Sequence, residues 1–197
     1  LVVSAIVGTC GMLIGYACVR RRGSRLSRIV ESLAFFPYLM PAMAFATIYL
    51  AVATSANFKF LYGTFGVLVL VASIKFLPFA SRSGVNSMMQ IAPEIEEAAV
   101  IFGVPWRTRM TRILFPIQKS SIISGYLLPV ISVMREVALF TLLVPYARYL
   151  LTTMLFSFNE TGYAQYGSAV TLLIILIIIL INFVTNKLTG ASFDKGI

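Results

Sequence analysis

The sequence contains no histidine, and its 197 residues include only seven acidic side chains and two cysteines. Without histidine the chain lacks the commonest general base and the commonest metal ligand. Cys10 and Cys18 would lie about 12 Å apart along a helix axis, which is too far for a disulfide. No G-x-x-x-x-G-K-[ST] pattern is present, so the chain is not expected to hydrolyse nucleotides itself. We therefore expect no enzyme activity, no metal site and no cofactor in this chain.

Charge is also scarce, because Asp, Glu, Lys and Arg make up 12% of the residues against about 25% in soluble domains. Hydrophobic residues make up 59%, and the mean hydropathy is +0.91. A soluble domain of this size has too little interior to bury so much apolar surface. The net charge of +9 could indicate a nucleic-acid partner, but the cations lie beside apolar runs, as they do in membrane proteins. The sequence thus predicts an integral membrane protein in contact with lipid, and no nucleic-acid partner.

Several apolar segments reach about 20 residues, the length that crosses about 30 Å of hydrocarbon as a helix. The expected spans are residues 1–19, 32–53, 64–81, 121–144 and 167–186. The predicted fold is therefore all-α, a polytopic transmembrane helical bundle of about five spans that forms one domain over residues 1–197. Because Leu1 already lies in an apolar run, we expect a fragment, or the C-terminal half, of a longer polypeptide.

The positions of Lys and Arg predict the orientation of these spans. Most of the cations would lie on one side of the membrane: the arginines between residues 20 and 28, the cations of the 82–120 segment and the lysines of the C-terminal tail. Only Lys59 and Arg148 would lie in loops on the other side. Because cytoplasmic loops carry the excess of cations, the N-terminus is predicted outside and the C-terminus in the cytoplasm. The aromatic region 146–166 would rest at the outer interface.

The 82–120 segment is too polar to cross a bilayer. The positions of its prolines and its glycine predict two short helices on the cytoplasmic side. Pro93 and the glutamates after it suit the first turn of a helix, and Gly103 suits its end. Pro105 would begin the second helix and Pro116 would mark its end. Such a pair, apolar on one face and charged on the other, could dock in a groove of another protein or lie on anionic lipid.

The residues that give this segment a recognisable pattern are Glu97, Ala98, Ala99, Gly103, Ile113 and Pro116. Their spacing resembles the EAA loop of the permeases of ABC importers, with Phe115 where that family usually has Leu. The resemblance implies a bacterial inner-membrane protein whose coupling loop, residues 82–120, sits in a cleft of a cytoplasmic ABC ATPase subunit, itself expected to be a dimer. It also implies a periplasmic or extracellular solute-binding protein, and a second permease unit or fused half.

The stretches "FFPYLMPAMAFATIYL" and "MREVALFTLLV" resemble the ferric-iron branch of these permeases. Ferric iron is accordingly the expected cargo, with phosphonate, polyamine, thiamine, sulfate or molybdate as alternatives. A secondary transporter driven by an ion gradient is a further alternative, which would rely on deep acids such as Glu136 and would leave the EAA-like loop unexplained.

Ionisable residues within the expected spans mark a possible translocation pathway, because charge at that depth is costly unless it is paired or hydrated. Arg135 and Glu136 are adjacent in the fourth span, so they point about 100° apart and each would face other spans or a cavity. Glu136 could meet a passing cation or a partner Lys or Arg, and Arg135 could meet an anion. Both residues could instead only brace the bundle. Lys75 in the third span is expected to reach toward the cytoplasm or, less favoured, to pair with an acid.

Overall fold

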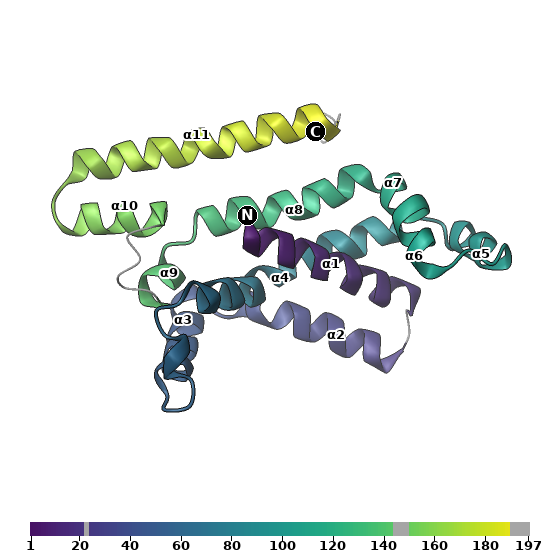
Figure 1. The fold of residues 1–197 in the computed structure, drawn as a ribbon, viewed down its shortest axis with the longest axis horizontal. Coiled ribbons are helices and arrows are strands. Elements are labelled where there is room, and N and C mark those ends of the chain that lie inside the picture. Colours follow the sequence, from purple (N-terminus) through teal and green to yellow (C-terminus); the bar gives the residue numbers. More distant parts are fainter. Residues whose placement is uncertain (22–23, 144–149, 190–197) are drawn as a thin grey trace.

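The computed structural model describes residues 1–21, 24–143 and 150–189, and every regular element in these ranges is a helix (Figure 1). The all-α prediction is confirmed. Within the described ranges, three helices are long and apolar enough to cross a membrane alone: α1 (Val2–Arg20), α4 (Phe65–Met89) and α11 (Ala164–Thr189). The other elements are α2 (Arg25–Phe35), η1 (Phe36–Leu39), α3 (Ala42–Thr54), η2 (Lys59–Leu61), α5 (Pro93–Ile101), α6 (Trp106–Thr108), η3 (Arg109–Leu114), α7 (Phe115–Ile117), α8 (Lys119–Met134), α9 (Ala138–Leu143) and α10 (Leu151–Glu160). Some residues used in the sequence predictions lie outside the described ranges. They are Arg22, Arg148 and Lys195 of the orientation prediction and residues 146–149 of the expected interface region.

The parallel pair α1 and α4 forms the centre of the molecule. Gly11 of α1 lies against Ala80 and Gly15 lies against Gly84, so residue numbers rise together along the two helices. A Cβ atom at any of these three glycines would stand well inside 3.0 Å of backbone atoms of the facing helix. Glycine is therefore required here by the closeness of two backbones, which is how small residues let membrane helices approach.

Helix α8 runs antiparallel to α4 and completes this central layer. Its Gly125 faces Ser83, while Gln118 at its beginning donates a hydrogen bond of 2.9 Å to the carbonyl of Ser87. The main apolar core lies where α1, α3, α4 and α9 meet, and its members include Val7, Val71 and Leu139. These side chains are almost inaccessible to solvent, so the core ties the bent segments to the central helices.

One of the five expected spans is bent and another directly follows a bend, and the sequence did not predict either. The second expected span, 32–53, is divided into α2–η1 and α3, which meet at 104°. Met40 adopts an extended conformation before Pro41, as residues before proline usually do, and the helix direction changes there. Residues 106–117 and α8 meet at 84°. The described residues contain five spans only when each bent pair counts as one span.

The boundaries of the third and fourth expected spans also differ from the prediction. Helix α4 continues to Met89 rather than ending near residue 81, so the first residues of the 82–120 segment belong to it. The fourth expected span, 121–144, breaks after Met134, and α9 follows only from Ala138. The expected fifth span lies within α11, which follows α10 through Gly162 at φ +81°.

Candidate functional site

Helix α5 carries the first half of the motif, and its end explains the glycine. The N–H of Gly103 donates to the carbonyl of Val100 at 2.9 Å, and the N–H of Val104 donates to that of Ala99 at 3.0 Å. Gly103 has φ +68°. These two bonds and the left-handed residue form a Schellman motif, which favours glycine at this position. The prediction that Gly103 ends the helix is confirmed.

The motif residues of α5 divide between two faces. Ala99 is buried against the rest of the molecule, whereas Glu97 and Ala98 are exposed. The end of the helix carries a tip of three apolar side chains, Val100, Ile101 and Phe102, and the last two expose 83% and 84% of their surface. Helix α5 lies at one end of the molecule, beyond the ends of α1, α4 and α8 (Figure 1). A projecting apolar tip next to an exposed carboxylate has the chemistry of a docking element.

The second half of the motif lies in a helical arm formed by α6, η3 and α7. Pro105 directly precedes this arm in an extended conformation, so the second helix begins one residue after the predicted start. Pro116 does not mark its end, because it lies inside α7 and the arm continues to Ile117. Proline has no N–H for an α-helical bond, and the six residues before Phe115 form a π-helix, a rare element that occurs mostly as a short insertion in α-helices. Ile113 is partly buried, while Pro116 is exposed.

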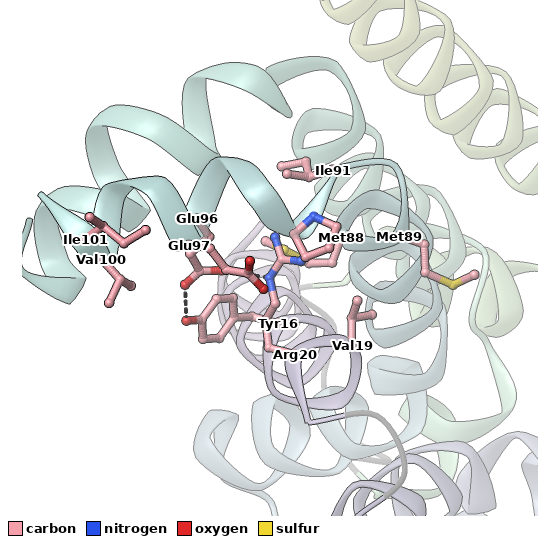
Figure 2. Close-up of a pocket in the computed structure, with 11 residues that line it drawn as sticks. Tyr16, Val19, Arg20, Met88, Met89, Ile91, Glu96, Glu97, Val100 and Ile101 are labelled. Atoms are coloured by element: carbon pink, nitrogen blue, oxygen red, sulfur yellow. Dashed lines mark hydrogen bonds and ion pairs between the residues drawn. The ribbon is translucent and has the colours of Figure 1, made fainter.

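Glu96 joins α5 to the rest of the protein. Its carboxylate accepts a 2.6 Å hydrogen bond from the hydroxyl of Tyr16 and a 2.7 Å bond from Nε of Arg20. Nε of Arg109, in the helical arm, lies 3.7 Å from the same carboxylate. Figure 2 shows Tyr16 and Arg20 of α1 facing this glutamate. The side chain of Glu96 is 10% exposed, so one buried carboxylate connects α1, α5 and the arm.

Apolar contacts reinforce this connection. Ile91, just before α5, packs on Met110 and Leu114 of the arm, and Tyr16 and Phe115 border the cluster. Below α5, a cleft of about 670 Å³ is bounded by the ends of α1 and α4 (Figure 2). The 82–120 segment is therefore fixed to α1 and α4 as a unit, while its tip stays free.

The motif comparison singled out Glu97 and missed Glu96. The signal that could have found Glu96 is its spacing, because residues three apart in a helix share a face and Glu96 is three residues before the buried Ala99. An acid on the buried face of a helix needs a cationic partner, and Arg20 and Arg109 supply it.

The ionisable residues of the expected fourth span lie at a break between helices. Glu136 pairs with Lys75 of α4 at 2.6 Å and accepts a 3.1 Å hydrogen bond from the N–H of Leu139. The alternative that Lys75 pairs with an acid is confirmed, and the expectation that it reaches toward the cytoplasm is wrong. Arg135 immediately follows α8 and is exposed. The structure therefore separates the two residues, with Glu136 in the bundle and Arg135 on its surface.

Removal of one member of the Lys75–Glu136 pair should destabilise the fold more than removal of both. Each side chain is 12% exposed, and breaking a buried pair on one side costs about 3–5 kcal/mol, whereas neutral replacement of both can be tolerated. We expect Lys75→Met to lower the thermal unfolding midpoint in detergent, and Lys75→Met with Glu136→Gln to recover part of the loss. Additive losses would mean that the two charges do not stabilise each other.

Comparison with known proteins agrees with this architecture. The family described as "Binding-protein-dependent transport system inner membrane component" matches residues 8–192. The phosphate transport system permease protein PstA 1 of Mycobacterium tuberculosis strain CDC 1551 is 27% identical over 187 residues, covering 84% of this chain and 59% of that protein. PstA of Mycobacterium leprae is 31% identical over 121 residues, covering 61% of this chain and 38% of that protein. The chain thus spans less than two thirds of the length of these curated relatives.

A solved structure with the same fold is the MetNI methionine ABC transporter in an inward-facing conformation. The similarity has a TM-score of 0.74 at 17% identity, and it covers 96% of this chain and 88% of that one. The family match extends over nearly all of the helices described above. This chain therefore belongs to the binding-protein-dependent transport system inner membrane components, the membrane-spanning permeases of ABC importers.

Proposed function

We propose that the chain forms the translocation pathway of an ABC importer and that the tip of α5 docks on a separate, dimeric cytoplasmic ATPase subunit. The observation that carries the proposal is the tip itself: Ile101 and Phe102 are almost fully exposed on a short helix that is held rigidly from behind. Surface apolar side chains of this size indicate a partner. The motif residues Glu97 and Ala98 lie on the exposed side of the same helix.

Movement of the tip would reach the spans through the contacts of Glu96. A shift of α5 acts on α1 through Arg20 and on the helical arm through Arg109. The arm leads directly into α8, and α1 is packed closely on α4. ATP hydrolysis would take place in the partner, and this chain would convert the resulting closure into alternating access.

The proposal also covers the orientation of the chain in the membrane, its pairing with a second permease unit and the delivery of cargo. The N-terminus of the described chain lies outside and the C-terminus in the cytoplasm of a bacterial inner membrane, since the cations gather on one side. A second permease unit, or a fused half, faces this one across the pathway. A solute-binding protein delivers cargo to the outer face. Glu136 is already paired with Lys75, which weakens the alternative of an ion-driven transporter with Glu136 as its free deep acid.

The cargo is a small solute, and phosphate is the first one to test. The curated relatives that match are permeases of phosphate transport. Ferric iron, expected from the resemblance of two stretches, finds no support among these relatives, and the same holds for phosphonate and polyamine.

The docking proposal is tested by purifying the tagged full-length protein from its native membrane in mild detergent and identifying what accompanies it. We expect an ABC ATPase to be recovered, and Glu97→Lys to reduce its recovery by about tenfold, because reversing an interfacial charge costs more than 1 kcal/mol. Glu160→Lys, the same change at an exposed site of α10, is the control. Recovery unaffected by Glu97→Lys, or loss of the ATPase with Glu160→Lys alone, would contradict docking through α5. Retention of anionic lipid instead of an ATPase would favour the lipid-bound alternative.

A further inference from the structure

A second cavity lies between α4, α8 and the η1 turn, away from the cleft under α5. Its volume is about 520 Å³. Polar side chains from α4 and α8 line it, with Phe35 and Tyr38 at one edge. The polar side chains that matter here are Arg82, Ser83, Asn86, Ser120, Ser121 and Ser124. We call this the α4–α8 groove.

The charge of the groove has one sign. Arg82 is its only ionisable group with a full charge at neutral pH, and no Asp or Glu among the described residues lines it. The guanidinium lies 5.1 Å from the centre of the Phe35 ring, a contact that leaves its charge uncompensated. No carboxylate in the described part of the chain forms an ion pair with Arg82. Glu31 is not among the residues that line the groove, and it borders a small neighbouring cavity that shares Arg82.

Hydrogen-bond donors surround this charge. The amide of Asn86 and the hydroxyls of Ser120 and Ser121 make no side-chain hydrogen bond to another described residue. The hydroxyl of Ser124 donates to the carbonyl of Ser120 at 3.1 Å, and that of Ser83 reaches the carbonyl of Ser121 only at 3.5 Å. A guanidinium with neutral donors nearby suits the oxygens of an anion, which accept hydrogen bonds and need none in return.

The polar lining makes hydrocarbon an unfavourable occupant of the groove. Asn86, Ser120 and Ser124 are exposed on this chain, on the faces where α4 and α8 approach each other. Polar groups in spans face water, protein or cargo rather than lipid tails. Helix α11 shows the contrast, because its exposed surface is apolar, with Ile175, Ile179 and Phe183 among its members.

We propose that the α4–α8 groove is a binding site for a small oxyanion in the translocation pathway, with Arg82 as its charged anchor. This rests on the proposed function, since it assigns the class of cargo to the same pathway. The groove has no carboxylate among its described lining residues with which to bind a metal cation or polyamine, so it selects against them. The Lys75–Glu136 pair, elsewhere on α4, is neutral as a unit, and Arg82 is the anion-attracting group among the described residues that line the groove.

The test measures the charge and occupancy of the groove directly. Ser124→Cys is introduced into the full-length transporter with Cys10→Ser and Cys18→Ala, and the protein is placed in phosphatidylcholine nanodiscs. We expect a negatively charged thiol reagent to react about tenfold faster than a positively charged one, because a nearby unit charge is worth more than 1 kcal/mol at intermediate dielectric. Inorganic phosphate should slow the reaction, and chloride at equal ionic strength should not. Ser168→Cys on the exposed side of α11 is the control.

Arg82→Gln should remove both the charge preference and the protection by phosphate, Arg82→Lys should keep part of each, and Arg25→Gln on α2 should change neither. Ser120→Cys serves as a second reporter if Ser124→Cys does not assemble. Equal reaction rates for the two reagents, or protection unchanged by Arg82→Gln, would overturn the proposal. Nanodiscs with phosphatidylglycerol separate the sources of the anion: protection by this lipid but not by phosphate would assign the groove to a headgroup and overturn the cargo site.

ATPase activity of the same complex, stimulated by its binding protein, is measured in parallel. If ATPase activity is present but phosphate does not slow the reaction of the groove cysteine, the anion site is refuted and the proposed function stands. Absence of ATPase activity together with failure to recover any ATPase would refute the proposed function itself. The two failures are therefore distinguishable.

Discussion

Replacement of Gly84 by leucine should prevent α1 from packing on α4 and should lower the thermal unfolding midpoint of the detergent-solubilised protein by far more than the same change at Gly66. A Cβ at Gly84 would overlap the carbonyl of Gly11, and the whole leucine side chain would have to enter the same contact. Both obstructing atoms are backbone, so no side-chain rotation relieves the overlap. Overpacking costs about 1–3 kcal/mol when the surroundings can adjust, and here the helices must separate.

Alanine gives the sharper comparison, because two effects then oppose each other. Glycine to alanine within a helix gains up to about 1 kcal/mol of helix propensity. At Gly66 nothing but the hydroxyl of Thr64, at 3.8 Å, lies near the new methyl group, so Gly66→Ala should stabilise the protein slightly. At Gly84 the overlap should outweigh that gain. A stabilising Gly84→Ala would show that α1 and α4 are not in backbone contact.

One side of this helix contact can be read from the sequence, and the other side cannot. Gly8, Gly11 and Gly15 recur along the first span at a spacing that favours close helix packing. Their partners, however, depend on which helix lies alongside, and that depends on the tertiary fold. Ala80 and Gly84 face Gly11 and Gly15, while the ring of Tyr126 from α8 faces Gly8. A regular small-residue spacing therefore indicates a contact surface but not its occupant.

Average hydropathy located the apolar segments but could not reveal their bends. Residues 32–53 and 121–144 are as apolar as a straight span would be, yet one turns at Pro41 and the other breaks after Met134. The residues around Pro41 carry a readable signal in the proline itself. The break after Met134 has no such signal. It coincides with Glu136, whose carboxylate binds Lys75 and the N–H of Leu139, and such a pairing cannot be predicted from one sequence.

The candidate site also has features that the sequence predicts and features that it does not. The two ends of α5 were predictable, because proline favours the first position of a helix and glycine favours the position just after its end. The positions of Pro93 and Gly103 confirm both ends. The partners of the glutamates were not predictable. Glu97 matches the motif and is exposed, whereas the adjacent Glu96 is buried and binds residues 80 positions before it and 13 after it, Tyr16 and Arg109.

Glu96→Gln should uncouple transport from ATP hydrolysis while leaving the protein inserted in the membrane. The amide keeps the size of the side chain, but it carries no charge. Tyr16 and Arg20 donate to different oxygens of Glu96, so the single oxygen of glutamine can accept from only one of these two sites. Arg20 and Arg109, each 16% exposed, then lose the carboxylate that they share. Loss of one side of a buried ion pair costs about 3–5 kcal/mol, and the partial exposure of both arginines places this case at the lower end. We expect α5 to detach from α1, cargo uptake to fall at least about tenfold, and ATP hydrolysis to continue without uptake.

Glu94→Gln is the matched control, since Glu94 lies on the same helix, is exposed and forms no ion pair with another described residue. It should leave uptake and the unfolding midpoint unchanged. A double-mutant cycle with Arg20→Gln then measures the link itself, and we expect a coupling energy of about 1 kcal/mol or more for groups in direct contact. Normal uptake by Glu96→Gln would mean that α5 transmits motion without this carboxylate, through the apolar packing of Ile91 on Met110 and Leu114 alone. Loss of uptake with an unchanged midpoint and no coupling to Arg20 would place the role of Glu96 at the ATPase interface instead of at α1.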